Sequence, residues 1–236
     1  MDLLSKNKII QWHDDSVVDP RFEQVVGRNN FQQPWFLKKG AEISKAVGLI
    51  PNQGTAFLVS SSIIMTNWHV FRRSYWAEGK KISFDVELGE NGLPLMPSSV
   101  ELAPDKLFYA NEDLDFAIVA LSSPVLNRDI INIRNFAPVV KDTRVNIIQH
   151  PGAGLKKIAI RENGIKYNDG NVIQYWTDTE HGSSGAPLFN DKWEIIGLHY
   201  MNDSAESNDG SKVYYNVGHT MMSIVENIDV THPGVL

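Results

Sequence analysis

Cysteine is absent from this 236-residue chain, and its absence removes several kinds of chemistry at once. Without thiols there is no disulfide framework, no thiol nucleophile and no zinc site built on thiolates. Serine, threonine, histidine and the carboxylates remain as candidate catalytic groups. A chain of this length buries roughly 70 to 75% of the surface that its unfolded form exposes, so its core needs neither disulfides nor a structural metal. We therefore expect no cofactor and no metal ion.

Long hydrophobic runs are also missing. The longest apolar stretches, 56–59 and 62–65, are far shorter than the roughly 20 residues that cross a bilayer. The opening segment, MDLLSKNKIIQWHDD, carries charges at Lys6 and Lys8 and lacks the apolar run, about 7 to 15 residues long, of a secretory signal. We therefore expect a soluble, cytoplasmic protein with no membrane partner.

Concentrated positive charge is the third thing that the sequence lacks. Its 22 basic and 28 acidic side chains give a formal charge of −6, and the basic residues gather only in pairs. Nucleic-acid binding depends on a basic patch that neutralises phosphates. We therefore expect no nucleic-acid partner.

Short runs of β-branched and aromatic residues, separated by Gly, Pro, Asn and Asp, make up most of the chain. They predict strands at 55–60, 63–66, 82–88, 116–121, 144–149, 157–160, 171–176, 193–199 and 213–217. Helical pattern is weak except at 40–47 and at 221–228, where Thr220 is a candidate N-cap. The spacing favours barrels or a sandwich over βαβ units. Residues 122–140 could connect two β modules within one unit.

A serine lies in a tight, glycine-flanked turn in the segment GSSGAP, residues 182–187. Hydrolysis of a peptide bond by a serine needs a base, a carboxylate that holds the base, and backbone N–H groups that stabilise the oxyanion. Ser184 is the candidate nucleophile, and the N–H groups of Gly182 and Ser184 are the candidate oxyanion donors. Gly-Ser-Ser-Gly is also a common surface loop, so this motif alone does not establish catalysis.

A histidine and an aspartate lie at the ends of two other predicted strands. His69 follows an apolar strand in TNWHV, and Asp115 begins the strand DFAIVAL, where its carboxylate can be desolvated and hydrogen-bonded to an imidazole. Each has an ordinary explanation by itself, because the chain has seven histidines and an acid often caps a strand. All three residues together, in the order His, Asp, Ser and in different halves of the chain, favour a catalytic triad.

The motifs around these residues resemble those of the chymotrypsin-like (trypsin-like) serine peptidases. TNWHV is similar to the TAxHC or TNxHV signature around their histidine, DFAIVAL to their aspartate strand, and GSSGAPLF to their GDSGGP or GNSGSP loop. The segments GTAFLV, QHPG and EIIGLHY have counterparts in bacterial trypsin-like and glutamyl endopeptidases. The resemblance covers roughly residues 40–228. It implies an all-β fold of two six-stranded antiparallel β-barrels with a C-terminal helix.

The implied organisation is a single peptidase unit over residues 1–236. An N-terminal arm would occupy about 1–39, the first barrel about 40–122, and the second barrel with the C-terminal helix about 140–236.

The resemblance also implies a role for each member of the triad. Ser184 would be the nucleophile, His69 the general base and then the general acid, and Asp115 the residue that orients the imidazole. Asp113 competes with Asp115, but only Asp115 directly precedes the apolar strand. Ser183 occupies the position of the trypsin aspartate that pairs with a new N-terminal amine. A serine cannot form that ion pair, so activation by the trypsin-type ion pair is not expected. Two alternatives stay open: the chain is active as made, or a partner or its own N-terminal segment holds it inactive.

Two further residues match positions that bind the acidic side chain before the scissile bond in glutamyl endopeptidases. They are Thr179, five residues before the nucleophile, and His199 in the following strand. A hydroxyl and an imidazole can bind a carboxylate by hydrogen bonds, and by charge when the histidine is protonated. Alternatively, His199 is a buried core residue, and Glu180 would repel an acidic substrate.

The expected function is that of a serine endopeptidase that cuts a protein or peptide substrate, with a preference for Glu at the cleavage position as a further hypothesis. A regulatory protein partner could hold it inactive. The alternative is a catalytically silent member of the family that binds peptides in its cleft. Esterase activity of the α/β-hydrolase kind is disfavoured, because that fold orders its residues Ser, acid, His within a GxSxG elbow.

Overall fold

The computed structural model of the protein describes residues 31–140, 143–160, 163–206 and 212–235. From Pro34 onward the chain forms one compact unit. Most of the N-terminal arm expected at about 1–39 lies outside the described residues. None of the helices that can be described is both long enough and apolar enough to cross a membrane.

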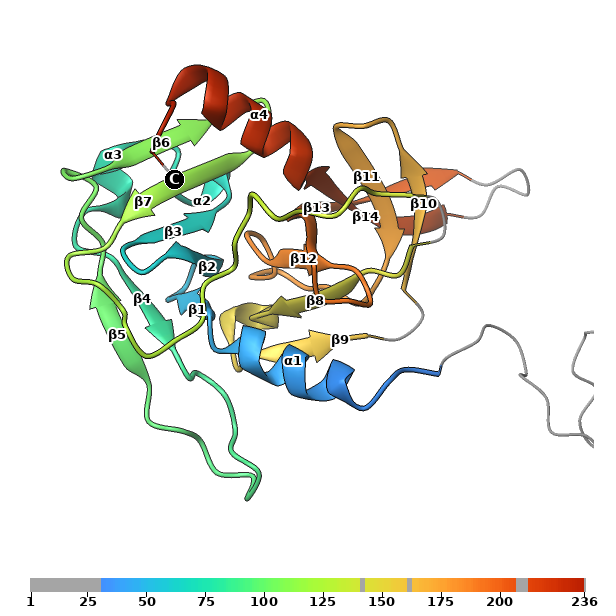
Figure 1. The fold of residues 1–236 in the computed structure, drawn as a ribbon, viewed down its shortest axis with the longest axis horizontal. Helices are drawn as coiled ribbons and strands as arrows, with labels where there is room; N and C mark the ends of the chain where they lie inside the picture. Colours follow the sequence, from blue (N-terminus) through green and yellow to red (C-terminus); the bar gives the residue numbers. More distant parts are fainter. Residues whose placement is uncertain (1–30, 141–142, 161–162, 207–211, 236) are drawn as a thin grey trace, which may run out of the picture. The chain divides into compact units, whose positions relative to one another are not determined.

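The first sheet has seven strands in the order β5-β4-β1-β2-β3-β7-β6, and all its pairings are antiparallel (Figure 1). The strands are β1 (Val47–Ile50), β2 (Gly54–Ser60), β3 (Ile63–Thr66), β4 (Lys81–Phe84), β5 (Ser98–Glu101), β6 (Phe108–Asn111) and β7 (Phe116–Ala120). Nearly every residue of β2 and all of β7 are buried. In the sequence, these two inner strands therefore form nearly continuous apolar runs.

The second sheet also has seven strands, in the order β10-β11-β14-β13-β12-β8-β9. They are β8 (Asn146–Gln149), β9 (Lys157–Ala159), β10 (Gly164–Asn168), β11 (Val172–Trp176), β12 (Pro187–Phe189), β13 (Ile195–Glu206) and β14 (Lys212–Thr220). All its pairings are antiparallel as well. The predicted all-β fold of two antiparallel sheets is thus confirmed.

The number of strands in each sheet is seven and not the six that we predicted. The two edges of the first sheet, β5 and β6, are consecutive in the chain, and so are the edges of the second sheet, β9 and β10. In the first sheet, Pro104 and the turn around it interrupt what would be one long strand. Beyond the end of β5, Ala103 N still donates to Ala120 O at 2.8 Å, which brings the two edges of the curled sheet together. The extra strand of the first sheet therefore comes from one barrel strand broken in two.

The larger hydrophobic core joins the two sheets. It combines buried side chains of the first sheet, such as Phe57 and Ile118, with Phe189 and Leu198 of the second. A smaller core, around Tyr175, belongs to the second sheet alone. The first sheet and the interface between the sheets thus hold most of the apolar packing.

Within the described residues, four α-helices accompany the sheets: α1 (Trp35–Ser44), α2 (Trp68–Phe71), α3 (Ser74–Ala77) and α4 (Met221–Thr231). A short 3-10 turn, η2, covers Pro151–Ala153. Thr220 caps α4 as predicted, because its side chain accepts a hydrogen bond from Ser223 N at 3.2 Å. Helix α4 lies above both sheets in Figure 1 and adds Ile224 and Ile228 to the larger core.

Helix α1 begins at Trp35 and not near Gly40, where we predicted its start. Pro34 stands at the N-cap, next to the first turn where a missing N–H costs little. Gly40 lies inside the helix. A Cβ at this position would stand 2.4 Å from the ring of Trp193, which explains why a glycine is found here. The indole of Trp193 also donates to Phe36 O at 2.8 Å, which fixes the helix against the second sheet.

Candidate active site

The imidazole of His69 and the carboxylate of Asp115 meet at the edge of the first sheet. His69 lies in the short helix α2, directly after β3, and Asp115 directly precedes β7. Asp115 Oδ2 lies 2.7 Å from His69 Nδ1, and Asp115 Oδ1 accepts from the backbone N–H of His69 at 2.9 Å. Both carboxylate oxygens therefore hold the histidine. With a proton on Nδ1, the ring turns a basic Nε2 away from the aspartate.

Asp115 is held in a strained backbone conformation. Its φ is 42°, in the left-handed region that a residue with a Cβ seldom adopts. The side-chain amide of Asn67 donates to Asp115 O at 2.7 Å, and Asp115 N donates to Glu112 O at 3.2 Å. These contacts hold the turn that aims the carboxylate at His69. The competing residue, Asp113, is exposed to solvent.

Ser184 lies in a loop shaped by two glycines with positive φ, Gly182 at 94° and Gly185 at 85°. Any Cβ on Gly182 would stand 2.4 Å from Ala153 N, and one on Gly185 would stand 2.1 Å from Thr55 O. Only glycine fits either position, because both the φ angle and the space exclude a side chain. The neighbouring Ser183 is fully buried, and its hydroxyl accepts from Glu180 N at 3.0 Å. Its side chain therefore braces the loop from within.

The amides of Gly182 and Ser184, which we predicted as oxyanion donors, have no acceptor among the contacts of the described residues. The carbonyl of His181 accepts from Gly152 N at 2.6 Å. In a trans peptide the N–H points opposite to the C=O, so this contact directs the Gly182 N–H away from Gly152. The loop is thus arranged with a donor free for a ligand.

Thr55 of β2 joins the first sheet to the serine loop, and sequence reasoning did not identify it. Its N–H donates to Ser184 O at 2.8 Å, and its hydroxyl donates to Gly182 O at 2.8 Å. The same hydroxyl oxygen accepts from His150 N at 3.0 Å. The only hint in the sequence is the segment GTAFLV, which gives no partner for the threonine.

The hydroxyl of Ser184 donates to Tyr200 O at 3.3 Å, and no hydrogen bond to His69 is found among the described residues. The serine and histidine segments nevertheless touch. A Cβ on Gly185 would stand 2.4 Å from Oγ1 of Thr66, a residue of the strand that leads to His69. Catalytic hydrogen bonds are often long or misaligned before substrate binds.

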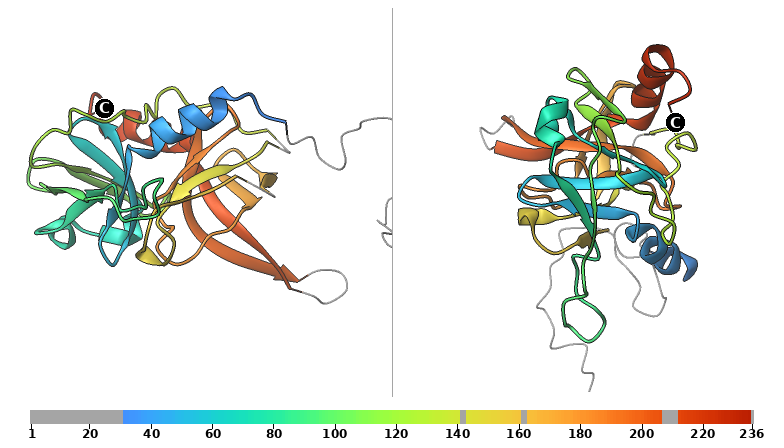
Figure 2. Two further views of the ribbon diagram at one scale, coloured as in Figure 1. Left: turned by 90° about the horizontal axis from the view of Figure 1, so that it is seen from below. Right: turned by 90° about the vertical axis from the view of Figure 1, so that its left-hand side faces the viewer.

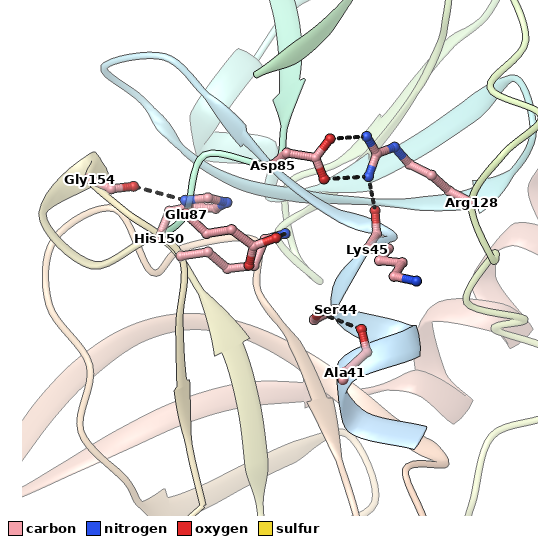
Figure 3. A network of polar contacts seen from close by, with 9 residues as sticks. Ala41, Ser44, Lys45, Asp85, Glu87, Arg128, His150 and Gly154 are labelled. Carbon is pink, nitrogen blue, oxygen red and sulfur yellow. Dashed lines mark hydrogen bonds and ion pairs between the residues drawn. The ribbon is translucent and has the colours of Figure 1, made fainter. Parts of the chain in front are cut away.

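A buried polar network supports the turn behind the serine loop (Figure 3). Lys156 N donates to Val86 O at 2.7 Å, and its ammonium lies 3.5 Å from Glu87 Oε1. Burial lowers the pKa of Lys156, while Glu87 counteracts that shift. Arg128 forms an ion pair with Asp85, which lowers the pKa of this carboxyl group through hydrogen bonding. These contacts join the segment after β4 to the turn that carries η2.

His150 lies in the same network, between Thr55 and η2. It is fully buried, and its Nδ1 lies 2.9 Å from Gly154 O. Burial lowers its pKa from 6.5 to about 4, so the ring is neutral at physiological pH. Its Nε2 has no hydrogen-bond partner among the described residues.

A pocket of about 1320 Å³ opens in the second sheet beside the serine loop. Its lining includes Thr179, together with Asp178, Glu180, Lys157 and Asn216. The hydroxyl of Thr179 donates to Asn216 Oδ1 at 2.5 Å. Two carboxylates and one ammonium group thus line the same pocket.

His199 does not line this pocket. It is 3% exposed, and its Nδ1 lies 2.7 Å from the hydroxyl of Tyr175. Burial and the nearby His69 lower the pKa of His199 to about 3. With no carboxylate bound beside it, His199 is therefore neutral near neutral pH. Among the residues that the structure describes, no group of three or more His, Asp or Glu could hold a metal ion.

Two curled antiparallel sheets, with His and Asp at the edge of one and a glycine-flanked Ser in the other, define the chymotrypsin-like class of serine peptidases. The family described as trypsin-like peptidase domain matches residues 54–198, more than half of the chain. The protein belongs to this family.

Two relatives are similar to this chain in sequence over about three quarters of its length. The uncharacterized protein y4fB of Sinorhizobium fredii is 30% identical over 206 residues, which cover 76% of this chain and 31% of y4fB. Glutamyl endopeptidase of Staphylococcus aureus is 25% identical over 178 residues, which cover 72% of this chain and 53% of that protein. The chain thus spans about half or less of the length of these relatives.

Solved structures share the fold. The inactive form of the Rv3671c protease of M. tuberculosis superposes with a TM-score of 0.54 at 18% identity, covering 85% of this chain and 96% of that one. The MamO protease domain of Magnetospirillum magneticum gives a TM-score of 0.54 at 10% identity, covering 79% and 97%.

Proposed function

We propose that the protein is a serine endopeptidase that hydrolyses peptide bonds through an acyl-enzyme. Ser184 attacks the carbonyl carbon, and His69 Nε2 takes the hydroxyl proton. His69 then gives this proton to the leaving amine, and a water molecule releases the acyl group by the same steps. Asp115 stabilises the imidazolium, and the amides of Gly182 and Ser184 stabilise the oxyanion.

The observation that carries this proposal is the double grip of Asp115 on His69, at 2.7 and 2.9 Å, together with a serine loop whose oxyanion amides have no acceptor among the described residues. A protein that only binds peptides in its cleft needs neither feature. The silent peptide-binding protein therefore remains the weaker alternative.

Replacement of the nucleophile tests the proposal directly. Ser184→Ala should lower kcat on a cleavable protein or peptide by a factor approaching ~10⁶, and His69→Ala with Ser184→Ala should lose little more than either alone. A fluorophosphonate probe should label Ser184 in the unaltered protein. Ser183→Ala is the matched control for the adjacent hydroxyl. Loss of activity in Ser183→Ala but not in Ser184→Ala would assign the nucleophile to Ser183.

A preference for Glu at the cleavage position rests on hydrogen bonds alone. His199 is neutral because its pKa is lowered to about 3, and the proton of the Thr179 hydroxyl is directed at Asn216. Asp178 and Glu180 on the same pocket wall oppose a further carboxylate. Matched Glu and Gln peptides test this preference. Their rate ratio should stay constant between pH 6 and 8, because neither His199 nor the substrate carboxyl titrates there.

The remaining proposals concern the setting of the enzyme. We place it in the cytoplasm, acting on a protein substrate, with a regulatory protein as a further partner and without nucleic-acid or membrane partners. Fractionation of cells that express the Ser184→Ala protein, followed by identification of the proteins that co-purify with it, examines these points together.

A further inference from the structure

The segment that follows β3 brings aromatic and cationic side chains together on the surface. His69 lies in α2, and α3 follows after only two residues, Arg72 and Arg73. The two helices lie side by side at the left-hand end of the first sheet in Figure 1, and Figure 2 (right), seen from that end, shows α3 in turquoise on the outer side of the sheet. Phe71 and Ala77 are fully buried and anchor the segment. Its other side chains therefore form a fixed outer surface next to His69.

Five residues define what we call the Trp–Arg surface: Trp68, Arg72, Arg73, Tyr75 and Trp76. Both arginines are exposed, Tyr75 is 59% exposed and Trp76 is 42% exposed. The guanidinium carbon of Arg72 lies 5.5 Å from the ring centre of Trp68 and 5.7 Å from that of Trp76. These cation–π contacts hold the guanidinium group in place without supplying a carboxylate partner.

The two arginines of this surface differ from the other arginines that the structure describes. Arg128, Arg134 and Arg144 each form an ion pair with an aspartate. Neither Arg72 nor Arg73 pairs with a carboxylate in the described part of the chain. An arginine offers five N–H donors in a planar fork that fits a carboxylate. The surface therefore presents two groups that are ready to bind an acid.

The charge of this stretch is opposite to that of the whole chain. No acidic residue occurs between Glu42 and Glu78, and residues 72–81 hold four basic side chains and one acidic side chain. The formal charge of the chain as a whole is −6. A concentration of one sign of charge attracts ligands of the opposite sign. An anionic segment is therefore steered to this part of the molecule.

The fold of the turn does not explain the arginine at position 72. Arg72 has a φ of 42°, in the left-handed region that costs free energy for a residue with a Cβ. Glycine or asparagine would suit this conformation better. The contacts of Arg72 with the two tryptophan rings stabilise the turn, which is the ordinary explanation. That explanation leaves the exposed Arg73 and Tyr75 without a role.

We propose that the Trp–Arg surface binds an acidic segment of the protein substrate that follows the scissile bond. The proposal rests on the endopeptidase function proposed above. Carboxylates of the substrate would pair with Arg72 and Arg73, and apolar side chains between these acids would pack on Tyr75 and Trp76. Trp, Tyr and Arg are the residue types that contribute most to the binding energy at protein interfaces.

The position of His69 selects this side of the substrate. His69 gives its proton to the leaving amine, so the chain that begins with this amine starts within hydrogen-bonding distance of the imidazole. Trp68 directly precedes His69 in the chain, and Arg72 follows it by three residues. A segment that runs from the imidazole toward α3 therefore reaches the two arginines within a few residues.

Peptides that differ only in charge test the inference on the unaltered protein. All share the residues around the scissile bond. The first carries a run of Asp and Glu after the bond, the second has Asn and Gln at these positions, and the third carries the acidic run before the bond. At about 20 mM salt we expect kcat/KM of the first to exceed that of the second about 5- to 20-fold, because an exposed ion pair contributes up to about 5-fold.

Salt and position decide whether this advantage comes from the Trp–Arg surface. Screening should reduce the advantage of the first peptide to less than about twofold at about 500 mM salt. An advantage that salt does not reduce would overturn the proposal. An equal advantage for the third peptide would overturn it as well, because the acidic run would then act on the other side of the bond.

Removal of charge from the surface locates the effect. Arg72→Gln combined with Arg73→Gln should lower the ratio of kcat/KM between the acidic and the neutral peptide to about one. Lysine at both positions should retain part of the ratio, because it keeps the charge but not the planar fork. Lys38→Gln combined with Lys39→Gln removes the same charge from α1 and is the matched control, which should keep the ratio within about twofold. A ratio that survives the loss of both arginines would contradict the proposal.

Binding is measurable apart from cleavage. The Ser184→Ala protein should raise the fluorescence anisotropy of a labelled acidic peptide, and Arg72→Gln combined with Arg73→Gln should abolish this rise. Absence of any Ser184-dependent cleavage would refute the endopeptidase function, whereas absence of the anisotropy change would refute the Trp–Arg surface as a binding site. Tighter binding of an oligothymidylate of the same length would overturn the choice of a protein segment as the occupant.

Discussion

The histidine half and the serine half of the candidate site are held by different kinds of contact. In the histidine half, a carboxylate grips an imidazole at 2.7 Å, both within the first sheet. In the serine half, backbone groups do the positioning, through glycines that no other residue can replace and hydrogen bonds to Thr55. The first half therefore depends on side-chain chemistry and the second on backbone shape. Single substitutions should affect them in different ways.

The largest expected effect is on the side-chain half. Asp115→Asn should lower kcat by about 10⁴, because an amide can no longer accept from both His69 Nδ1 and His69 N and disfavours the required tautomer. Asp113→Asn, two residues away and exposed, is the matched control and should change kcat less than about twofold. Steady-state kinetics on one peptide measure both. Similar losses in the two variants would contradict the assignment.

A smaller effect is expected on the backbone half. Thr55→Val keeps the shape of the side chain but leaves Gly182 O and His150 N without their partner. We expect kcat to fall about 10- to 100-fold at nearly constant KM, since an unsatisfied buried group costs about 1 to 3 kcal/mol. Thr55→Ser should restore most of the rate. The rate of fluorophosphonate labelling should fall with kcat in Thr55→Val and recover in Thr55→Ser.

The smallest effect concerns stability, through the buried histidines behind the serine half. The folded-state pKa values of His150 and His199 are about 4 and about 3, below the ordinary 6.5. Between pH 6.5 and 5 the unfolded chain binds these protons and the folded chain does not. The free energy of unfolding should therefore fall with decreasing pH, by up to about 1.4 kcal/mol per pH unit for each histidine.

Urea denaturation across this pH range measures the slope of the free energy of unfolding against pH. His150→Gln should reduce this slope by the contribution of about one proton. An unchanged slope in His150→Gln would mean that His150 is protonated in the folded protein.

Local sequence was sufficient to select the candidate catalytic residues. The fragments around His69, Asp115 and Ser184 are recognisable because a strand end and a glycine turn each depend on residues that are neighbours in the sequence. Several strands were also predicted to within a residue or two, such as β2 and β3. Five short strands, of three to five residues each, were missed: β1, β5, β6, β10 and β12. β5, with the sequence SSVE, is largely exposed and has no pattern to find.

Contacts between distant segments could not be predicted. Thr55 and Gly182 are 127 residues apart, and no local feature of either residue indicates that the other is its partner. The same holds for Lys156 and Glu87, 69 residues apart. The outer part of β13 was not predicted as a strand, since its residues are polar, and it is a strand through its pairing with β14. His199 was placed near the substrate by resemblance, whereas its burial depends on Tyr175.

Helix α4 has a consequence for how the enzyme is made. It follows Ser184 in the chain, yet it packs on the first sheet, where Tyr109 OH donates to Asn227 Oδ1 at 2.7 Å and Arg134 pairs with Asp229 at 2.6 Å. During synthesis the ribosome releases the first sheet well before the serine loop, and α4 last of the three. The contacts that join α4 to the earlier part of the chain therefore form only after the serine loop has been synthesised.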